Sequence, residues 1–115
     1  MKARNFKNYK ELLTSCDIGL STVMLKKSLI TKKCKFSRLK TKEDFVLWLS
    51  ILKKNVLIAA FNKNLTTWRK LNQSLSSSIT QKLKDGYTLY SKYVGFNFFK
   101  SLFYLFLLSI NSLRK

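Results

Sequence analysis

The sequence predicts a small α/β domain in which short buried strands and helices follow one another along the chain. Two apolar runs have the length and composition of buried strands, residues 18–25 (IGLSTVML) and 56–61 (VLIAAF). Between them, the segment from Thr41 to Leu52 has apolar side chains at helical spacing, and residues 79–93 repeat that pattern. With 115 residues, the chain has room for one domain and a small core.

The first long helix has the clearest start. Thr41 is the expected N-cap, and the carboxylates of Glu43 and Asp44 in the first turn suit the positive end of the helix dipole. Before this helix, the run 18–25 is expected as a strand and 26–40 as a charged connection.

After the helix, residues 56–61 and 65–69 are expected to form a pair of short strands, joined by a turn at 62–64. The serine-rich stretch 72–78 fits a loop that ends by capping the helix at 79–93. We therefore expect residues 1–94 to form the main domain.

Residues 95–115 are the most hydrophobic part of the chain and are expected to form a separate aromatic and basic helix. Its uninterrupted apolar stretch is shorter than the roughly 20 residues that a spanning helix needs. A helix lying at a membrane surface is one interpretation, and a helix packed on the rest of the protein is the other. The basic start of the chain lacks the apolar stretch of a signal peptide.

Composition and charge narrow the classes of function. There is no histidine and there are two cysteines, so a zinc site, a disulfide framework and a histidine-based triad are not expected. The 23 basic and 5 acidic residues give a net charge of +18, which favours polyanions such as nucleic acid, anionic lipid or phosphorylated ligands. The densest basic run, 26–42, has an ordinary solvated surface as its alternative explanation.

Two motifs point to chemistry. Glu43 and Asp44 at a helix start are held rigidly, as a general base must be, although such pairs also serve as simple caps. Further on, Trp68-Arg69-Lys70 offers an arginine that can bind phosphate oxygens and an aromatic ring for a sugar or base. A basic turn beside a core tryptophan is the alternative for the second motif.

In this order, the motifs resemble the C-terminal half of a bacterial family-two glycosyltransferase of surface-polysaccharide synthesis, including that of lipopolysaccharide. The resemblance runs from about residue 9 to the C-terminus and rests on four stretches: residues 16–23 (CDIGLSTV), 42–49 (KEDFVLWL), 64–69 (NLTTWR) and 72–76 (NQSLS).

The resemblance implies part of a GT-A fold, the α/β sandwich that binds nucleotide-diphospho-sugars. It makes Asp44 the base that deprotonates the acceptor hydroxyl, assisted by Glu43. It places Arg69 and Trp68 on a loop over the donor diphosphate and acceptor, and Ser21 and Thr22 at the end of a strand that lines the sugar pocket. The expected substrates are a nucleotide-sugar donor and a saccharide or lipid-linked acceptor.

The family's N-terminal half, with its β-α-β unit and its Asp-x-Asp motif for a divalent metal, has no counterpart in this sequence. We therefore expect no cofactor in this chain, Mg²⁺ or Mn²⁺ in the complete enzyme, and no activity unless another chain supplies that half. The expected location is cytoplasmic, peripheral at the inner face of the bacterial membrane.

Two other functions fit the composition. A small basic nucleic-acid-binding protein would explain the charge, but the sequence has no helix-turn-helix, zinc-finger or RNA-binding signature, so nucleic acid is not the expected partner. A membrane-surface-binding protein would explain residues 95–115 alone. The discriminating observations are salt-sensitive binding of nucleic acid for the first and leakage of liposomes for the second.

Overall fold

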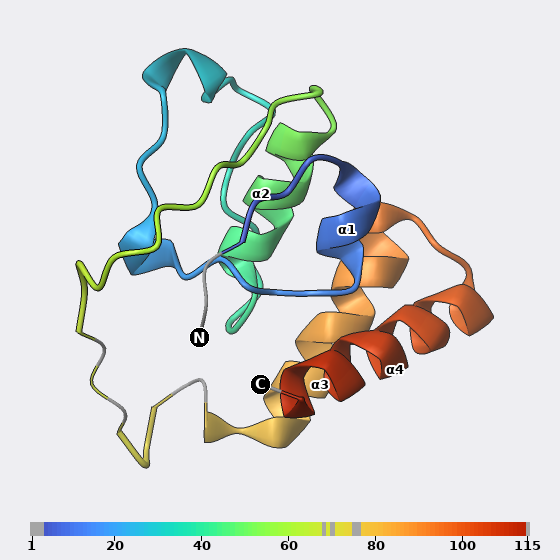
Figure 1. Ribbon diagram of the computed structural model, residues 1–115. Helices are drawn as coiled ribbons and strands as arrows, with labels where there is room; N and C mark the ends of the chain where they lie inside the picture. The colour runs from blue at the N-terminus through green and yellow to red at the C-terminus, as the bar shows by residue number, and fades with distance from the viewer. Residues whose placement is uncertain (1–3, 68, 70, 75–76, 115) are drawn as a thin grey trace.

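The computed structural model describes residues 4–67, 69, 71–74 and 77–114, and this part of the chain is a compact helical domain (Figure 1). Two 3-10 turns, η1 and η2, precede the long helices, and η4 is a π-helix that continues α3. The elements in chain order are α1 (Tyr9–Leu13), η1 (Leu20–Thr22), η2 (Lys27–Leu29), α2 (Glu43–Leu52), α3 (Ile79–Thr88), η4 (Leu89–Val94) and α4 (Phe98–Leu113).

The predicted strands are not found in the described residues, and the prediction of strands was wrong. Residues 18–25 contain η1, which is closed because the N–H and the hydroxyl of Thr22 both donate to the carbonyl of Gly19, at 3.0 and 2.7 Å. Residues 56–61 pair only through Ile58, which forms one isolated antiparallel bridge with Phe6. Residues 65–67 and 69 have no regular structure, and residue 68 lies outside the described part.

The physical reason is that a strand needs a neighbouring backbone to satisfy its N–H and C=O groups. Phe6 supplies such a neighbour for Ile58, with reciprocal backbone hydrogen bonds of 2.8 and 3.0 Å. No described segment lies beside residues 18–25 or 65–67 in this way. Strand propensity without a partner leaves these segments as turns and irregular connections, and the observed domain is helical where an α/β domain was expected.

The prediction of the first long helix is confirmed, and this helix, α2, lies at the centre of the core. Most of its residues are buried, so it contacts other parts of the chain on nearly every side. The buried members are Phe45, Leu47, Trp48, Leu49, Ile51 and Leu52. Because burial of apolar surface is the main favourable term in folding, α2 contributes a large share of the stability of the domain.

The start of α2 differs from the prediction. The N-cap position is Lys42, which makes no side-chain capping hydrogen bond, and the expected cap Thr41 lies one residue earlier. The hydroxyl of Thr41 instead donates to the carboxylate of Asp85 on α3 at 2.8 Å. Thr41 therefore binds the charged carboxylate of a distant residue and does not cap α2, because hydrogen bonds to ionised groups are stronger than those to neutral ones.

The predicted helix at 79–93 is confirmed as α3 and η4. Ser78 caps α3 as expected, since its hydroxyl accepts a hydrogen bond from the N–H of Gln81. Gly95 ends η4 with a φ of 83°, a left-handed conformation that favours glycine. Asn97 then caps α4, its side-chain oxygen accepting from the N–H of Lys100 at 2.9 Å.

Long-range hydrogen bonds join the first helix to the last two. The hydroxyl of Tyr90 donates to the carbonyl of Leu13 at the end of α1. The amide of Asn111 on α4 donates to the carbonyl of Thr14 at 2.7 Å. The pair formed by α3–η4 and α4 is thereby tied to α1, which itself contacts α2.

The predicted C-terminal helix is confirmed as α4, which runs beside α3 in Figure 1. In the described part of the chain, no helix has both the length and the apolar character needed to cross a membrane. Buried Ser101 and Leu108 mark the face of α4 that packs on the domain. The opposite face carries exposed phenylalanines, among them Phe99 and Phe106.

Candidate functional site

Glu43 and Asp44 occupy the first turn of α2, where the sequence places them. Burial raises the pKa of the Asp44 carboxyl, and the neighbouring charge of Glu43 raises it further. The indole of Trp48 and the first backbone N–H groups of the helix act in the opposite direction, but they do not cancel the rise. A helix start alone predicts a lowered pKa. In this fold, partial desolvation makes Asp44 a stronger base than an ordinary aspartate.

Two other acidic residues, Glu11 and Asp17, are engaged in contacts of their own. Glu11 accepts hydrogen bonds from the N–H of Lys7 and the amide of Asn8, and Asp17 forms an ion pair with Arg4 at 2.9 Å. Glu43 and Asp44 have no ion pair in the described part of the chain. The two carboxylates are therefore not neutralised by a neighbouring cation, although the indole of Trp48 and backbone N–H groups act on Asp44.

Trp48 follows Asp44 by one helical turn and is 3% exposed. Its indole N–H lies near enough to the Asp44 carboxylate to oppose the rise of the pKa. The indole N–H of Trp48 has no hydrogen-bond partner of regular geometry among the described residues. A buried N–H donor without a full partner is costly, so the indole favours the ionised form of Asp44.

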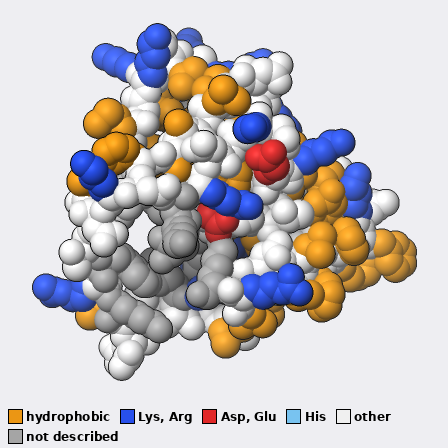
Figure 2. All heavy atoms as spheres, viewed as in Figure 1, with side chains coloured by type: hydrophobic (Ala, Val, Ile, Leu, Met, Phe, Trp, Pro, Cys, Tyr) orange, Lys and Arg blue, Asp and Glu red, His pale blue; other side chains and the backbone are white. Residues whose placement is uncertain are grey.

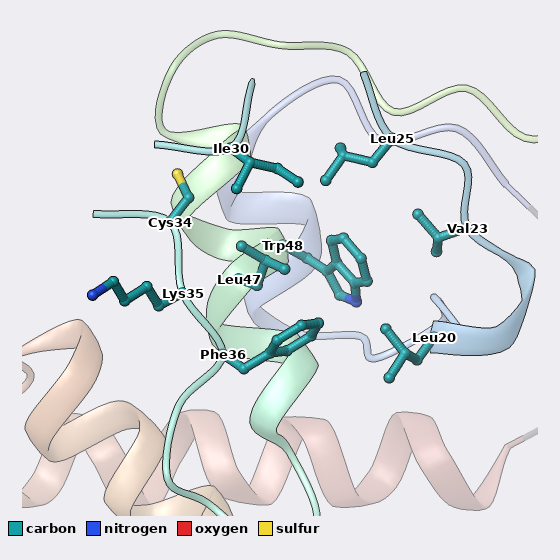
Figure 3. Close-up of a pocket in the computed structure, with 9 residues that line it drawn as sticks. All are labelled: Leu20, Val23, Leu25, Ile30, Cys34, Lys35, Phe36, Leu47 and Trp48. Carbon is teal, nitrogen blue, oxygen red and sulfur yellow. The ribbon is translucent and has the colours of Figure 1, made fainter. Parts of the chain in front are cut away.

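The indole ring of Trp48 also forms part of an apolar cavity of about 420 Å³ on one side of α2 (Figure 3). Residues from η1, the connection that follows it and α2 meet there. The lining consists of Leu20, Val23, Leu25, Ile30, Cys34, Lys35, Phe36, Leu47 and Trp48. The cavity is large enough for part of a ligand or for an inserted side chain.

Asp85 is a positioning residue that sequence reasoning missed. It is 5% exposed, and its two oxygens accept from the N–H and hydroxyl of Thr41 and from the amide of Gln81. Burial would raise the pKa of Asp85, but these hydrogen bonds outweigh it and lower the pKa. Asp85 therefore stays ionised and fixes the chain two residues before Glu43. The sequence held one signal for this role. Asp85 is one of only five acidic residues and follows Gln81 by four positions, a spacing at which two side chains meet on a helix.

Ser21 and Thr22 lie in η1 and are exposed, so the expectation that they end a strand was wrong. Their neighbours Leu20 and Val23 line the cavity beside Trp48, whereas Ser21 and Thr22 are not among its lining residues. The local reason is the turn at Gly19, whose carbonyl accepts both hydrogen bonds from Thr22. A role for these two hydroxyls at a sugar remains a prediction.

Arg69 is exposed in the irregular connection between α2 and α3, and Trp68 lies outside the described residues. In Figure 1 the first part of this connection passes α2, and the rest follows the left and lower edge of the molecule. The described structure brings Glu43, Asp44 and Trp48 together in the first turns of α2, and no ion pair joins Arg69 to either carboxylate among the described residues. The roles assigned to Arg69 and Trp68 remain predictions.

Comparison with known proteins gives one informative match. Over 107 residues, the chain is 27% identical to a Bacillus subtilis (strain 168) protein named "Putative teichuronic acid biosynthesis glycosyltransferase TuaG". The match covers 93% of this chain but 42% of the relative, so the chain spans less than half of that protein's length. No family model matches the chain, and no solved structure matches it.

The similarity extends over both α2 and the C-terminal helices, because it includes nearly the whole chain. It supports a general glycosyltransferase role and is consistent with the resemblance found in the sequence motifs.

Proposed function

We propose that this chain forms the acceptor side of a family-two glycosyltransferase and that Asp44 is its general base. The observation that carries the proposal is the pKa of Asp44, which burial and Glu43 raise at a rigid helix start. A general base works best when its pKa approaches the working pH, and a raised aspartate moves in that direction. In the proposed reaction, Asp44 takes the proton of the acceptor hydroxyl, whose oxygen attacks the anomeric carbon as the nucleoside diphosphate leaves, with inversion.

The proposed acceptor is a saccharide or lipid-linked saccharide of a surface polysaccharide, and the donor is a nucleotide-diphospho-sugar. Glu43 is proposed to assist at the acceptor, while Arg69 and Trp68 would approach the diphosphate when the connection between α2 and α3 closes over it. Support for this part comes from the motif order and from the similarity to TuaG.

The GT-A fold is proposed for the complete enzyme, with the other half supplied by another polypeptide segment. Residues 56–61 support this, because burial alternates along them: Val56, Ile58 and Ala60 are partly buried, whereas Leu57, Ala59 and Phe61 are exposed. Such a period of two is typical of a strand with one covered face. A docking half that offers backbone partners would convert this segment into a strand and cover its outer side chains.

A divalent metal is proposed for the other half only. Among the described residues of this chain, no three side chains of the metal-binding types come together. The residues present therefore do not fit a metal site, and the proposed base step does not depend on one.

The test is reconstitution. The segment of TuaG that this chain does not match is fused to this chain, and transfer of radiolabelled sugar from a panel of nucleotide-sugars to a lipid extract is measured. Transfer by the fusion, with none by this chain or by the TuaG segment alone, is the expected result. A folded fusion that binds nucleotide-sugar but transfers nothing to any acceptor would contradict the proposal.

A further inference from the structure

The outer face of α4 consists of exposed apolar side chains. Phe99, Leu102, Phe103 and Phe106 follow the spacing i, i+3, i+4, i+7, which aligns them along one side of a helix. We call these four residues the α4 stripe. Phe99 is 80% exposed and Phe106 is 63% exposed, although the opposite face of the same helix is packed.

Further apolar side chains are exposed on α3, which packs beside α4. Ile79 and Leu83 are exposed one turn apart on α3, and the ring of Tyr87 meets the ring of Phe98 edge-on at 6.1 Å between centroids. Figure 2 shows hydrophobic side chains gathered at the right of the molecule, where Figure 1 places α4. Exposed apolar side chains gathered in this way mark an interaction site.

The part of the chain that carries the stripe has charges of one sign. Asp85 is the last acidic residue of the chain, and only basic charges follow it: Lys92, Lys100, Arg114 and Lys115. Lys92, Lys100 and Arg114 are exposed. The ammonium of Lys100 lies 4.3 Å from the centroid of the Phe96 ring, so a cation is held at the start of the helix beside the apolar surface. This arrangement complements an anionic surface with an apolar interior.

The dimensions of α4 favour a position parallel to such a surface. Its 16 residues span about 24 Å at the usual rise of 1.5 Å per residue, less than the thickness of the hydrocarbon core. One face is already occupied by the domain. Only the stripe can enter an apolar phase, and it can do so along its whole length.

We propose that the α4 stripe docks onto an anionic lipid bilayer, with its phenylalanines at the boundary of the acyl chains and its cations among the headgroups. A second copy of this chain would fit the stripe less well, because two chains of +18 repel each other. The inference does not depend on sugar transfer. Together with the proposed function, it would keep the chain at the surface where lipid-linked acceptors reside.

The test is sedimentation with unilamellar vesicles of equal parts phosphatidylglycerol and phosphatidylcholine, or of phosphatidylcholine alone. We expect binding to the anionic vesicles that weakens in about 0.5 M salt, on the scale at which such charges are screened. The variant Phe99→Ser/Phe106→Ser should lower the partition coefficient at least about tenfold, because each buried phenylalanine contributes strongly to transfer from water.

The matched control is Leu57→Ser/Phe61→Ser, which removes two apolar side chains of similar exposure far from α4 in sequence; Phe61 is 66% exposed. It should bind vesicles as the unchanged chain does. An equal loss in both variants, or no binding of the unchanged chain to anionic vesicles, would overturn the proposal. A dimer in sedimentation velocity that Phe99→Ser/Phe106→Ser dissociates would overturn it too, by making the stripe a self-association surface.

A second measurement does not rely on loss of binding. Tryptophan placed by Phe106→Trp should be quenched by brominated lipid in the vesicles, whereas tryptophan placed by Phe61→Trp should not, each compared with the unchanged chain. Because both positions are exposed, neither change disturbs the core. Equal quenching at the two positions would contradict docking through α4.

Discussion

Thr41 donates two hydrogen bonds to the same oxygen of Asp85, one from its backbone N–H at 2.9 Å and one from its hydroxyl at 2.8 Å. The two residues are separated by 44 positions, and Asp85 lies on α3. The amide of Gln81 holds the second oxygen at 2.9 Å. Thr41 is thereby fixed to another helix, two positions before Glu43. This contact holds the start of α2, which carries the proposed base Asp44, in one position.

Thr41→Val should destabilise the domain by about 1–2 kcal/mol, because a buried carboxylate loses one hydrogen bond while its charge remains. Urea unfolding followed by circular dichroism measures the change. Thr22→Val is the matched control, since the hydroxyl of Thr22 makes an exposed hydrogen bond to Gly19, and it should change stability by less than about 0.5 kcal/mol. Equal effects of the two changes would show that the link to Asp85 contributes nothing.

The free energy of unfolding should depend on pH through Asp44. The sign of this dependence should be opposite to that of an acid held in an ion pair. The folded pKa of Asp44 is raised, so the folded state binds a proton more readily than the unfolded state, and stability falls as pH rises from the unfolded pKa through the folded pKa. Asp44→Asn removes this loss.

The measurement is urea unfolding of both proteins from acid to neutral pH. The unchanged chain and the Asp44→Asn variant should be similar at the acid end, and the variant should become relatively more stable toward neutral pH. Asp17→Asn serves as the contrasting control, because it removes an acid that forms an ion pair with Arg4. A relative stability of Asp44→Asn that falls with rising pH would contradict the raised pKa.

Tyr90 should be the tyrosine whose hydroxyl matters most for stability. It is completely buried, burial raises its pKa, and its hydroxyl donates to the carbonyl of Leu13. Tyr90→Phe should cost about 1–2 kcal/mol, because the Leu13 carbonyl then loses its buried donor. Tyr93→Phe, at a 37% exposed position, should cost much less in the same unfolding experiment. Similar costs would mean that Leu13 finds another donor.

Alanine substitutions at two glycines distinguish the effect of backbone conformation on stability from the effect of the space at the Cβ position. Gly95 has a φ of 83° and open space at its Cβ position, whereas Gly19 has a φ of −85° and the Thr22 hydroxyl oxygen at an ordinary 3.6 Å. Gly95→Ala should destabilise by about 1 kcal/mol through its left-handed backbone, and Gly19→Ala should be nearly neutral. Thermal unfolding compares them, and the reverse order would contradict the assigned conformation at Gly95.

Local patterns predicted the helices and failed for the strands. α2, α3 and α4 have their apolar residues at helical spacing, and Gly86 inside α3 does not interrupt the pattern, because a helix satisfies its own backbone. A strand at residues 18–25 needs a distant neighbour, which propensity cannot supply. The cap at Thr41 was wrong for the same reason, since its partner Asp85 lies far along the sequence.

The candidate site, too, could be predicted from the sequence only in part. Glu43 and Asp44 could be selected from sequence because their adjacency and position in a helix are local. The raised pKa of Asp44 could not, because it arises from burial, which is a property of the folded chain. The place of Trp48 in the cavity wall also depends on η1 and the connection after it, which were expected as strand and loop.

The role of Asp44 as the general base is tested by the rate of sugar transfer of the reconstituted fusion carrying Asp44→Asn, with the affinity for nucleotide-sugar measured alongside it. We expect kcat to fall by about 10²–10⁴-fold, the usual contribution of a general base, while the Kd for the donor is unchanged. Asp17→Asn in the same fusion should transfer at the unchanged rate. Transfer by the Asp44→Asn fusion at the rate of the unaltered fusion would contradict the assignment of Asp44 as the base.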